Sequence, residues 1–175
     1  MAAAENPLPR VLPVTQCEDA RGLVLKHAAN ELIFGVVGHV GSGTSEIADA
    51  LRDILSDTTL PGGAFQVEIL KARDVIRDWA KQNGETLPDE TERRLGGTIA
   101  FQDLGDKMRA RTTSSGEADY PAVARGLVLR VRESRAKRLG QAVKDADPVL
   151  PDGTRRAYIL DSLRHPAEVH LLRHV

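Results

Sequence analysis

The segment that most constrains the fold runs from residue 31 to about residue 56. Residues 31–37 are almost continuously apolar, which is typical of a strand buried on both faces of a parallel sheet. Residues 38–43 follow with a glycine at each end. From residue 44 to about residue 56 apolar side chains recur at helical spacing, which predicts an amphipathic helix. A buried strand joined to a helix by a glycine loop predicts a βα unit of an α/β domain.

The rest of the chain alternates between predicted strands and predicted helices. Apolar runs predict strands over residues 32–37, 65–70 and 157–161. Helical spacing predicts a short helix that stops at residues 83–84, a helix over about 90–111, one that begins at Pro121 and a last one from about Pro166. Strands separated by helices predict a mostly parallel sheet with helices on both faces. We expect an N-terminal leader over residues 1–30 and one domain over residues 31–175.

Composition limits the classes of partner. The net charge of −1 argues against general nucleic-acid binding, and 3% aromatic residues leave little material for stacking bases. No apolar run approaches the roughly 20 residues that a membrane-spanning helix needs. Cys17 is the single cysteine, so it cannot build an internal disulfide framework. These features predict a cytoplasmic protein with no membrane partner.

The glycine loop has the spacing of a phosphate-binding loop. Gly38 and Gly43 match the two glycines of G-x-x-x-x-G-K-[ST], and Ser45 stands where the magnesium-binding hydroxyl belongs. Glycines let backbone N–H groups turn toward a phosphate, and the following helix N-terminus adds a favourable dipole. We therefore expect a nucleotide's phosphates to be bound by Gly38, His39, Gly41, Ser42, Gly43, Thr44 and Ser45. The alternatives are a glycine-rich turn without a ligand and, for His39, simple exposure to solvent.

Thr44 occupies the position of the usual lysine. Without that lysine the β- and γ-phosphates lose a positive charge, which argues against efficient phosphoryl transfer by the usual route. The sequence therefore favours nucleotide binding over rapid turnover.

A second candidate site follows the predicted strand 157–161. A carboxylate at the carboxyl end of a parallel strand lies where ligands collect in open α/β sheets, so Asp161 is expected to share a Mg²⁺ ion with Ser45. Arg164 is expected to reach a phosphate with its planar fork. The alternative makes Asp161 a loop residue or helix cap and Arg164 its surface partner.

Other basic residues offer less specific candidates. Arg135 lies four residues after Val131, toward the apolar stripe of its helix, so we expect it to supply positive charge to the phosphates as well. Asp106 and Arg109, one turn apart on the helix 90–111, fit either the wall of a nucleotide pocket or a simple ion pair.

Through the glycine loop and the Asp161 segment, the chain resembles the N-terminal P-loop domain of bacterial anti-phage dCTP/dCMP (deoxycytidylate) deaminases. The resemblance covers about residues 31–175 and is carried by residues 34–45 and 158–169, and more loosely by residues 103–109 and 131–138. The same segments are similar to deoxynucleoside monophosphate kinases, which carry a strand followed by D-x-x-R-x-P-x-E. The Thr-Ser pair in place of Lys-Ser or Lys-Thr favours the deaminase family.

The resemblance implies a P-loop NTPase-like, nucleotide-kinase-like fold that binds a deoxynucleotide with Mg²⁺ and acts as a regulatory, sensing part of the deaminase. It implies a zinc-dependent deaminase domain in cis, which depletes deoxycytidine nucleotides, and it allows a homo-oligomer. A zinc deaminase needs H-x-E and P-C-x-x-C, and both are missing here. We therefore expect no zinc and no deamination from this chain, and a domain truncated at its C-terminal end. A deoxynucleoside monophosphate kinase or slow NTPase, and a degenerate P-loop scaffold that binds protein alone, remain as alternatives.

Overall fold

A small parallel sheet forms the centre of the protein. The computed structural model describes residues 30–88, 95–113, 115–142 and 149–174. Its strands are β1 (Glu31–Val37), β2 (Gln66–Lys71) and β3 (Arg156–Leu163). They form one sheet in the order β1-β3-β2, with both pairings parallel. The predicted α/β class with a parallel sheet is confirmed, and the more specific P-loop fold stays a prediction.

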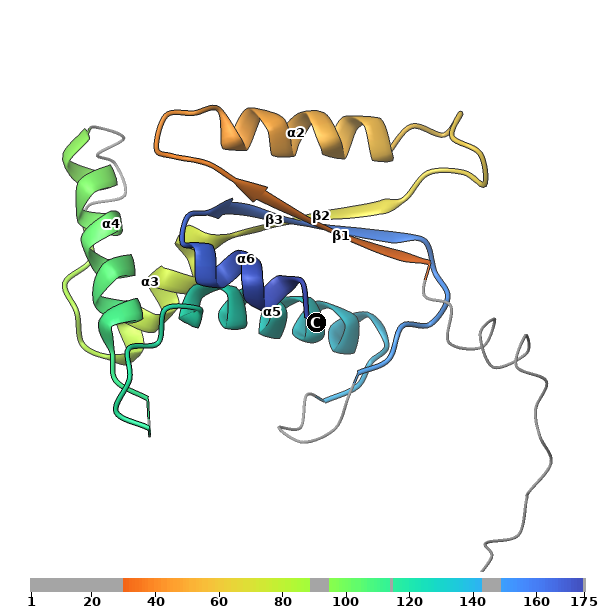
Figure 1. Cartoon of the computed structure of the whole chain (residues 1–175). Coiled ribbons are helices and arrows are strands. Elements are labelled where there is room, and N and C mark those ends of the chain that lie inside the picture. The colour runs from red at the N-terminus through yellow and green to blue at the C-terminus, as the bar shows by residue number, and fades with distance from the viewer. Residues whose placement is uncertain (1–29, 89–94, 114, 143–148, 175) are drawn as a thin grey trace, which may run out of the picture.

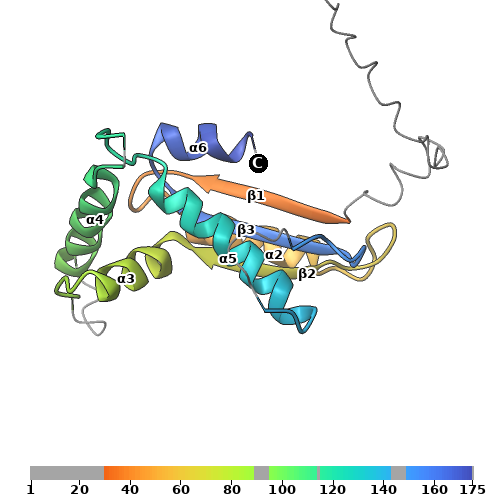
Figure 2. The ribbon, with the colours of Figure 1, turned by 90° about the horizontal axis from the view of Figure 1, so that it is seen from below.

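Helices cover both faces of this sheet (Figure 1). The helix α2 (Thr44–Leu55) lies on one face, and α3 (Ala72–Gln82), α5 (Ala122–Arg138) and α6 (Pro166–Leu172) lie on the other. The helix α4 (Leu95–Ala110) contacts α3 and α5 and stands beside the carboxyl end of the sheet (Figure 2). Among the described residues, no helix is both long and apolar enough to cross a membrane.

The central strand β3 is buried because it has a strand on each side and helices on each face. Its side chains alternate between two hydrophobic clusters, as the pleat of a strand requires. Ala157 and Ile159 pack toward α2, whereas Tyr158, Leu160 and Leu163 pack toward α3 and α5. A strand buried on both faces explains why this run is continuously apolar in the sequence.

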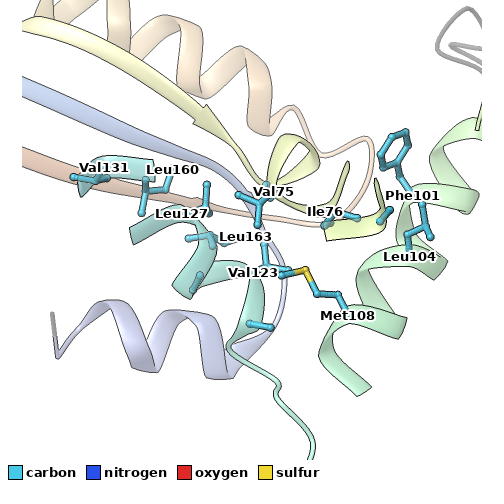
Figure 3. Close-up of a cluster of buried hydrophobic side chains, with 14 of the residues drawn as sticks. Val75, Ile76, Phe101, Leu104, Met108, Val123, Leu127, Val131, Leu160 and Leu163 are labelled. Atoms are coloured by element: carbon cyan, nitrogen blue, oxygen red, sulfur yellow. The ribbon is translucent and has the colours of Figure 1, made fainter. Parts of the chain in front are cut away.

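The larger cluster joins the sheet to α3, α4 and α5 (Figure 3). Val75 from α3, Met108 from α4 and Leu127 from α5 meet there. The helices α3 and α5 approach closely at Gly126, where a Cβ atom would lie 2.3 Å from Cγ1 of Val75. This packing fixes α3 and α4 relative to the carboxyl end of the sheet, where the candidate site lies.

Most predicted elements are confirmed within one or two residues, and one boundary differs. The strand β3 continues to Leu163 instead of ending at Asp161. The predicted leader 1–30, apart from residue 30, and residues 89–94 of the predicted helix 90–111 lie outside the described residues.

Candidate functional site: the glycine loop, Asp161 and the adjoining cavity

Parallel pairing brings the two halves of the candidate site together. The strand β1 leads into the glycine loop, and the N–H of Gly38 donates to the carbonyl oxygen of Leu163 at 3.2 Å. Since β1 and β3 are hydrogen-bonded neighbours, the carboxyl end of β3 lies directly beside the loop. The predicted adjacency of the loop and Asp161 is therefore confirmed.

The loop needs its glycines for two different reasons. At Gly38 a Cβ atom would lie 2.5 Å from Oγ of Ser42 and 2.6 Å from Cγ2 of Thr44, so a larger residue there would displace both of these loop side chains. Gly41 and Gly43 have φ values of 75° and 78°, which lie in the left-handed region that side chains disfavour. Because the spacing of these glycines matches their geometric roles, the loop is built by local sequence.

The N-terminus of α2 is open toward the loop. Its N-cap is Gly43, and no side chain of the described residues caps it. The N–H groups of a first helical turn have no partner within the helix, and together with the helix dipole they favour an anion. Glu46 in the same turn also benefits from that dipole. The first turn can therefore bind a phosphate in competition with solvent and with Glu46.

A hydroxyl and a carboxylate meet at the start of α2. Ser45 Oγ donates to Oδ2 of Asp161 at 3.1 Å, and Ser162 Oγ donates to the other carboxylate oxygen, Oδ1, at 2.9 Å. The hydroxyl oxygens of Thr44 and Ser162 lie 3.3 Å apart. Asp161 is 2% exposed, so its charge is held in a partly dry environment. Oxygen donors of this kind are the ligands that Mg²⁺ prefers, and Ser45 and Asp161 fit the predicted magnesium pair.

A bulge in β3 explains how a residue inside the strand reaches the loop. Gly35 pairs with Leu160 and Val37 pairs with Leu163, so β3 has one extra residue in this interval. Ser162 has a φ value of 70°, which is uncommon for a residue with a side chain. Bulges bend a strand and re-aim side chains. The expectation that Asp161 ends the strand is wrong for this reason, since β3 continues past it through the bulge.

A cavity of about 360 Å³ adjoins Ser45 and Asp161. It extends from them to α3, α4 and the segment after β3. Its lining includes Ser45, Lys71, Arg73, Phe101, Asp106, Arg109, Asp161, Arg164 and His165. Burial, together with the nearby charge of Arg109, lowers the pKa of the Arg164 guanidinium, which stays cationic at neutral pH. The structure thus places Arg164 in the same cavity as Ser45 and Asp161, and its predicted contact with a phosphate stays a prediction.

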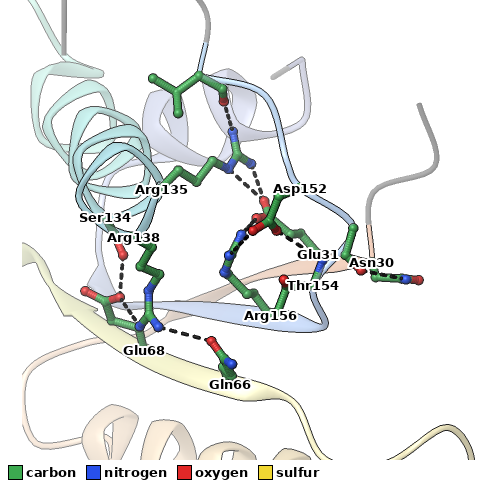
Figure 4. A network of polar contacts seen from close by, with 12 residues as sticks. Asn30, Glu31, Gln66, Glu68, Ser134, Arg135, Arg138, Asp152, Thr154 and Arg156 are labelled. Carbon is green, nitrogen blue, oxygen red and sulfur yellow. Dashed lines mark hydrogen bonds and ion pairs between the residues drawn. The ribbon is translucent and has the colours of Figure 1, made fainter. Parts of the chain in front are cut away.

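The structure places Arg135 elsewhere, so its predicted role at the phosphates is wrong. Its Nη2 atom pairs with Oε2 of Glu31 at 2.6 Å, and its Nη1 donates to the carbonyl oxygen of Val149 (Figure 4). Glu31 begins β1, whereas the loop follows the end of β1, roughly 20 Å away at about 3.3 Å per residue. Helical spacing identified the face of α5 that Arg135 occupies, but not the end of the sheet that it reaches.

His39 and Arg109 were each left with two alternatives by the sequence. The His39 side chain is exposed, and its carbonyl oxygen shapes the loop by accepting bonds from the N–H and Oγ of Ser42. Both arrangements that the sequence allowed for Arg109 are present, because it lines the cavity and its Nη1 also pairs with Asp106 at 3.2 Å.

Sequence reasoning missed the partner that holds Arg109. Glu168 is fully buried, and its Oε1 lies 2.8 Å from Nη2 of Arg109. Its Oε2 accepts from the N–H groups of Arg164 and His165 at 2.9 and 3.0 Å. The signal was present, because Pro166 followed by Glu168 is typical of a capping box at a helix start.

The chain was also compared with known proteins. No family model, curated protein or solved structure matched it. Within the part of the chain that the structure describes, no group of three or more His, Cys, Asp or Glu residues could hold a metal ion.

Proposed function

We propose that the protein binds a deoxynucleotide with Mg²⁺ through its glycine loop. The observation that carries this proposal is the hydrogen bond of 3.1 Å between Ser45 Oγ and Asp161, located at an uncapped helix N-terminus and reached through glycines with positive φ values. A strand-loop-helix with this spacing and a carboxylate from the neighbouring strand is the arrangement that P-loop proteins use for nucleotide phosphates.

Each part has a separate task in the proposed complex. Backbone N–H groups over residues 41–45 would hold the phosphates, and Ser45 with Asp161 would hold the metal, which neutralises phosphate charge when bound. Arg164 would add positive charge from the cavity side. Asp161 can act in this way because Ser45 and Ser162 already fix its carboxylate.

Thr44 in place of the usual lysine indicates whether the bound nucleotide is sensed or turned over. Thr44 bonds to Ser162 and cannot supply the charge that stabilises a transferring phosphoryl group. We therefore propose a sensing role, as in the regulatory part of a deoxycytidylate deaminase that depletes deoxycytidine nucleotides. A deoxynucleoside monophosphate kinase or slow NTPase is the second candidate, favoured by arginines of the cavity that could replace the missing lysine.

Calorimetric titration of the full chain with dCTP, dCMP and the other dNTPs, with and without Mg²⁺, tests the proposal. Gly43→Val should abolish binding, because a branched side chain at a φ of 78° disrupts the loop. Ser45→Ala should weaken binding mainly when Mg²⁺ is present, whereas Ser56→Ala at the other end of α2 is the matched control. Arg164→Ala should cost about 1.5–3 kcal/mol, the range for a hydrogen bond to a charged group.

The outcomes separate the candidates. Equal affinity of the wild type and Gly43→Val would overturn the phosphate-loop proposal. Formation of a deoxynucleoside diphosphate from ATP and a deoxynucleoside monophosphate at about 1 s⁻¹ or more, the lower range for kinases, would move the function to the second candidate, and so would slow but measurable release of inorganic phosphate from a dNTP. Circular dichroism of each variant checks that the fold is intact.

A further inference from the structure

The strand β1 has an open side that can pair with another strand. In the described part of the chain β1 pairs with β3 alone, so its other side is an edge of the sheet (Figure 2). Edge strands commonly carry charges or proline, because these prevent pairing with a strand of another molecule. Residues 32–37 contain neither a charge nor a proline. The edge of β1 therefore lacks the features that usually keep two sheet edges apart.

The apolar side chains of β1 are exposed on both faces of the sheet. Ile33 and Val37, on the face of α5 and α6, are 50% and 52% exposed, and Leu32 on the face of α2 is 39% exposed. Ile33, Gly35 and Val37 line an apolar groove of about 620 Å³ between β1, α5 and α6. Burial of apolar surface is the dominant favourable term in most protein association, and a further strand beside β1 would bury side chains on both faces.

Glu31 does not place its charge at this edge. Its carboxylate is turned into its own chain, where it pairs with Arg135 at 2.6 Å and with Arg156 at 3.1 Å, and its side chain is 2% exposed (Figure 4). Like charges directly opposite each other destabilise a strand pair. Two copies of β1 can therefore approach each other without this repulsion.

The hydrogen bonds to β3 show which backbone groups of β1 face outward. The N–H of Arg156 donates to the carbonyl oxygen of Asn30, and the N–H of Gly38 donates to that of Leu163. Backbone groups of successive strand residues point to alternate sides, so the even-numbered residues face β3. The N–H and C=O groups of residues 31, 33, 35 and 37 consequently face the open edge.

We propose that a second copy of this chain pairs its β1 antiparallel with this edge, so that a two-fold dimer forms one continuous sheet. Alignment about Phe34 matches the strands over residues 31–37 and sets outward-facing residues opposite each other, which is the hydrogen-bonded arrangement of an antiparallel pair. In this register Ile33 lies opposite the partner's Gly35, which leaves room on the groove face because it has no side chain.

This complementarity of β1 to itself favours a second copy over an unrelated strand. A two-fold interface uses the same surface on both subunits, so each contact must occur twice. Here the contact of Ile33 with the partner's Gly35 is repeated by the contact of Gly35 with the partner's Ile33. The inference is independent of nucleotide binding, since it concerns the edge of the sheet and not the glycine loop.

Sedimentation equilibrium of the full chain at several concentrations tests the dimer. Ile33→Lys should weaken it at least about tenfold, because the two lysines would lie diagonally across the strand pair, within reach of each other. The matched control is Ile99→Lys on α4, where the isoleucine is 46% exposed, and it should leave the dimer unchanged. Ile33→Glu should also weaken the dimer, whereas an equimolar mixture of Ile33→Lys and Ile33→Glu should associate again through opposite charges. Circular dichroism checks that each variant is folded.

Hydrogen exchange of the wild type tests the edge without any substitution. Exchange at the amides of residues 33, 35 and 37 should slow as the protein concentration rises. Protection that does not depend on concentration would mean that a segment of the same chain covers the edge, and it would overturn the inference. A wild type that stays monomeric at about 0.1 mM, association of Ile33→Lys as tight as that of the wild type, or a charge mixture that fails to associate would also overturn it.

Discussion

Replacing Glu168 by glutamine should lower the free energy of unfolding strongly, because this carboxylate is fully buried and ion-paired. The two oxygens of Glu168 serve different donors: Oε1 accepts from Arg109, and Oε2 accepts from the N–H groups of Arg164 and His165. The side chain is fully buried, so water cannot replace any of these bonds. Glu168 therefore joins α4 to the segment that links β3 and α6.

The expected magnitude follows from this geometry. A glutamine amide has one acceptor oxygen, so its NH₂ group must face either the guanidinium of Arg109 or the two backbone N–H groups. In either orientation, donors oppose donors in a buried place. Removing one partner of a buried ion pair costs about 3–5 kcal/mol, and we expect Glu168→Gln to lower the free energy of unfolding by that amount. Since whole domains are stable by about 5–15 kcal/mol, the change should be large.

Urea denaturation of the full chain, followed by circular dichroism, measures this cost. The matched control is Glu85→Gln, because Glu85 pairs with Lys107 of the same helix α4 at 2.7 Å, with side chains that are 30% and 58% exposed. Exposed pairs contribute about 0–1 kcal/mol, so the control should change little. If Glu168→Gln lay within about 1 kcal/mol of the wild type, the reasoning from burial and donor count would be refuted.

Three further predictions follow from other parts of the structure. Gly126→Ala should lower the free energy of unfolding by about 1–3 kcal/mol, the cost of overpacking, because its Cβ atom would meet Val75. The control Gly96→Ala lies on open helix surface and should not destabilise the protein. Equal urea midpoints for the two variants would contradict this prediction. The hydrogen bond from Arg156 holds the pKa of Asp152 well below its usual value, so its stabilising effect is present above about pH 4 and is lost as the pH falls further. The difference in urea midpoint between the wild type and Asp152→Asn should therefore shrink below about pH 4, and a constant difference would argue against it. The full chain should form no uridine nucleotide from dCTP or dCMP, because it lacks the zinc ligand motifs, and measurable product would disprove that expectation.

Local sequence determined the glycine loop and the elements on either side of it. The apolar run of residues 31–37 predicted a strand buried on both faces, but β1 is an edge strand in which Ile33 and Val37 are 50% and 52% exposed. The sequence did specify a strand here and, at Gly43 with its φ value of 78°, a turn that favours glycine. These features depend on neighbours in the sequence, so the sequence alone predicts them. The same reasoning identified Ser45 and Asp161 as partners, because parallel strands end at the same edge of a sheet.

Tertiary structure decided which distant side chains meet. Arg135 and Arg109 are both arginines near apolar helix positions, yet Arg135 pairs with Glu31 at the start of β1 whereas Arg109 lines the cavity at the other end of the sheet. Helical periodicity gives the face of a helix, but the position of that helix along the sheet depends on packing such as the contact of Gly126 with Val75. The bulge at Ser162 is likewise a property of the paired strands, because it exists only where β3 has one more residue than the strand beside it.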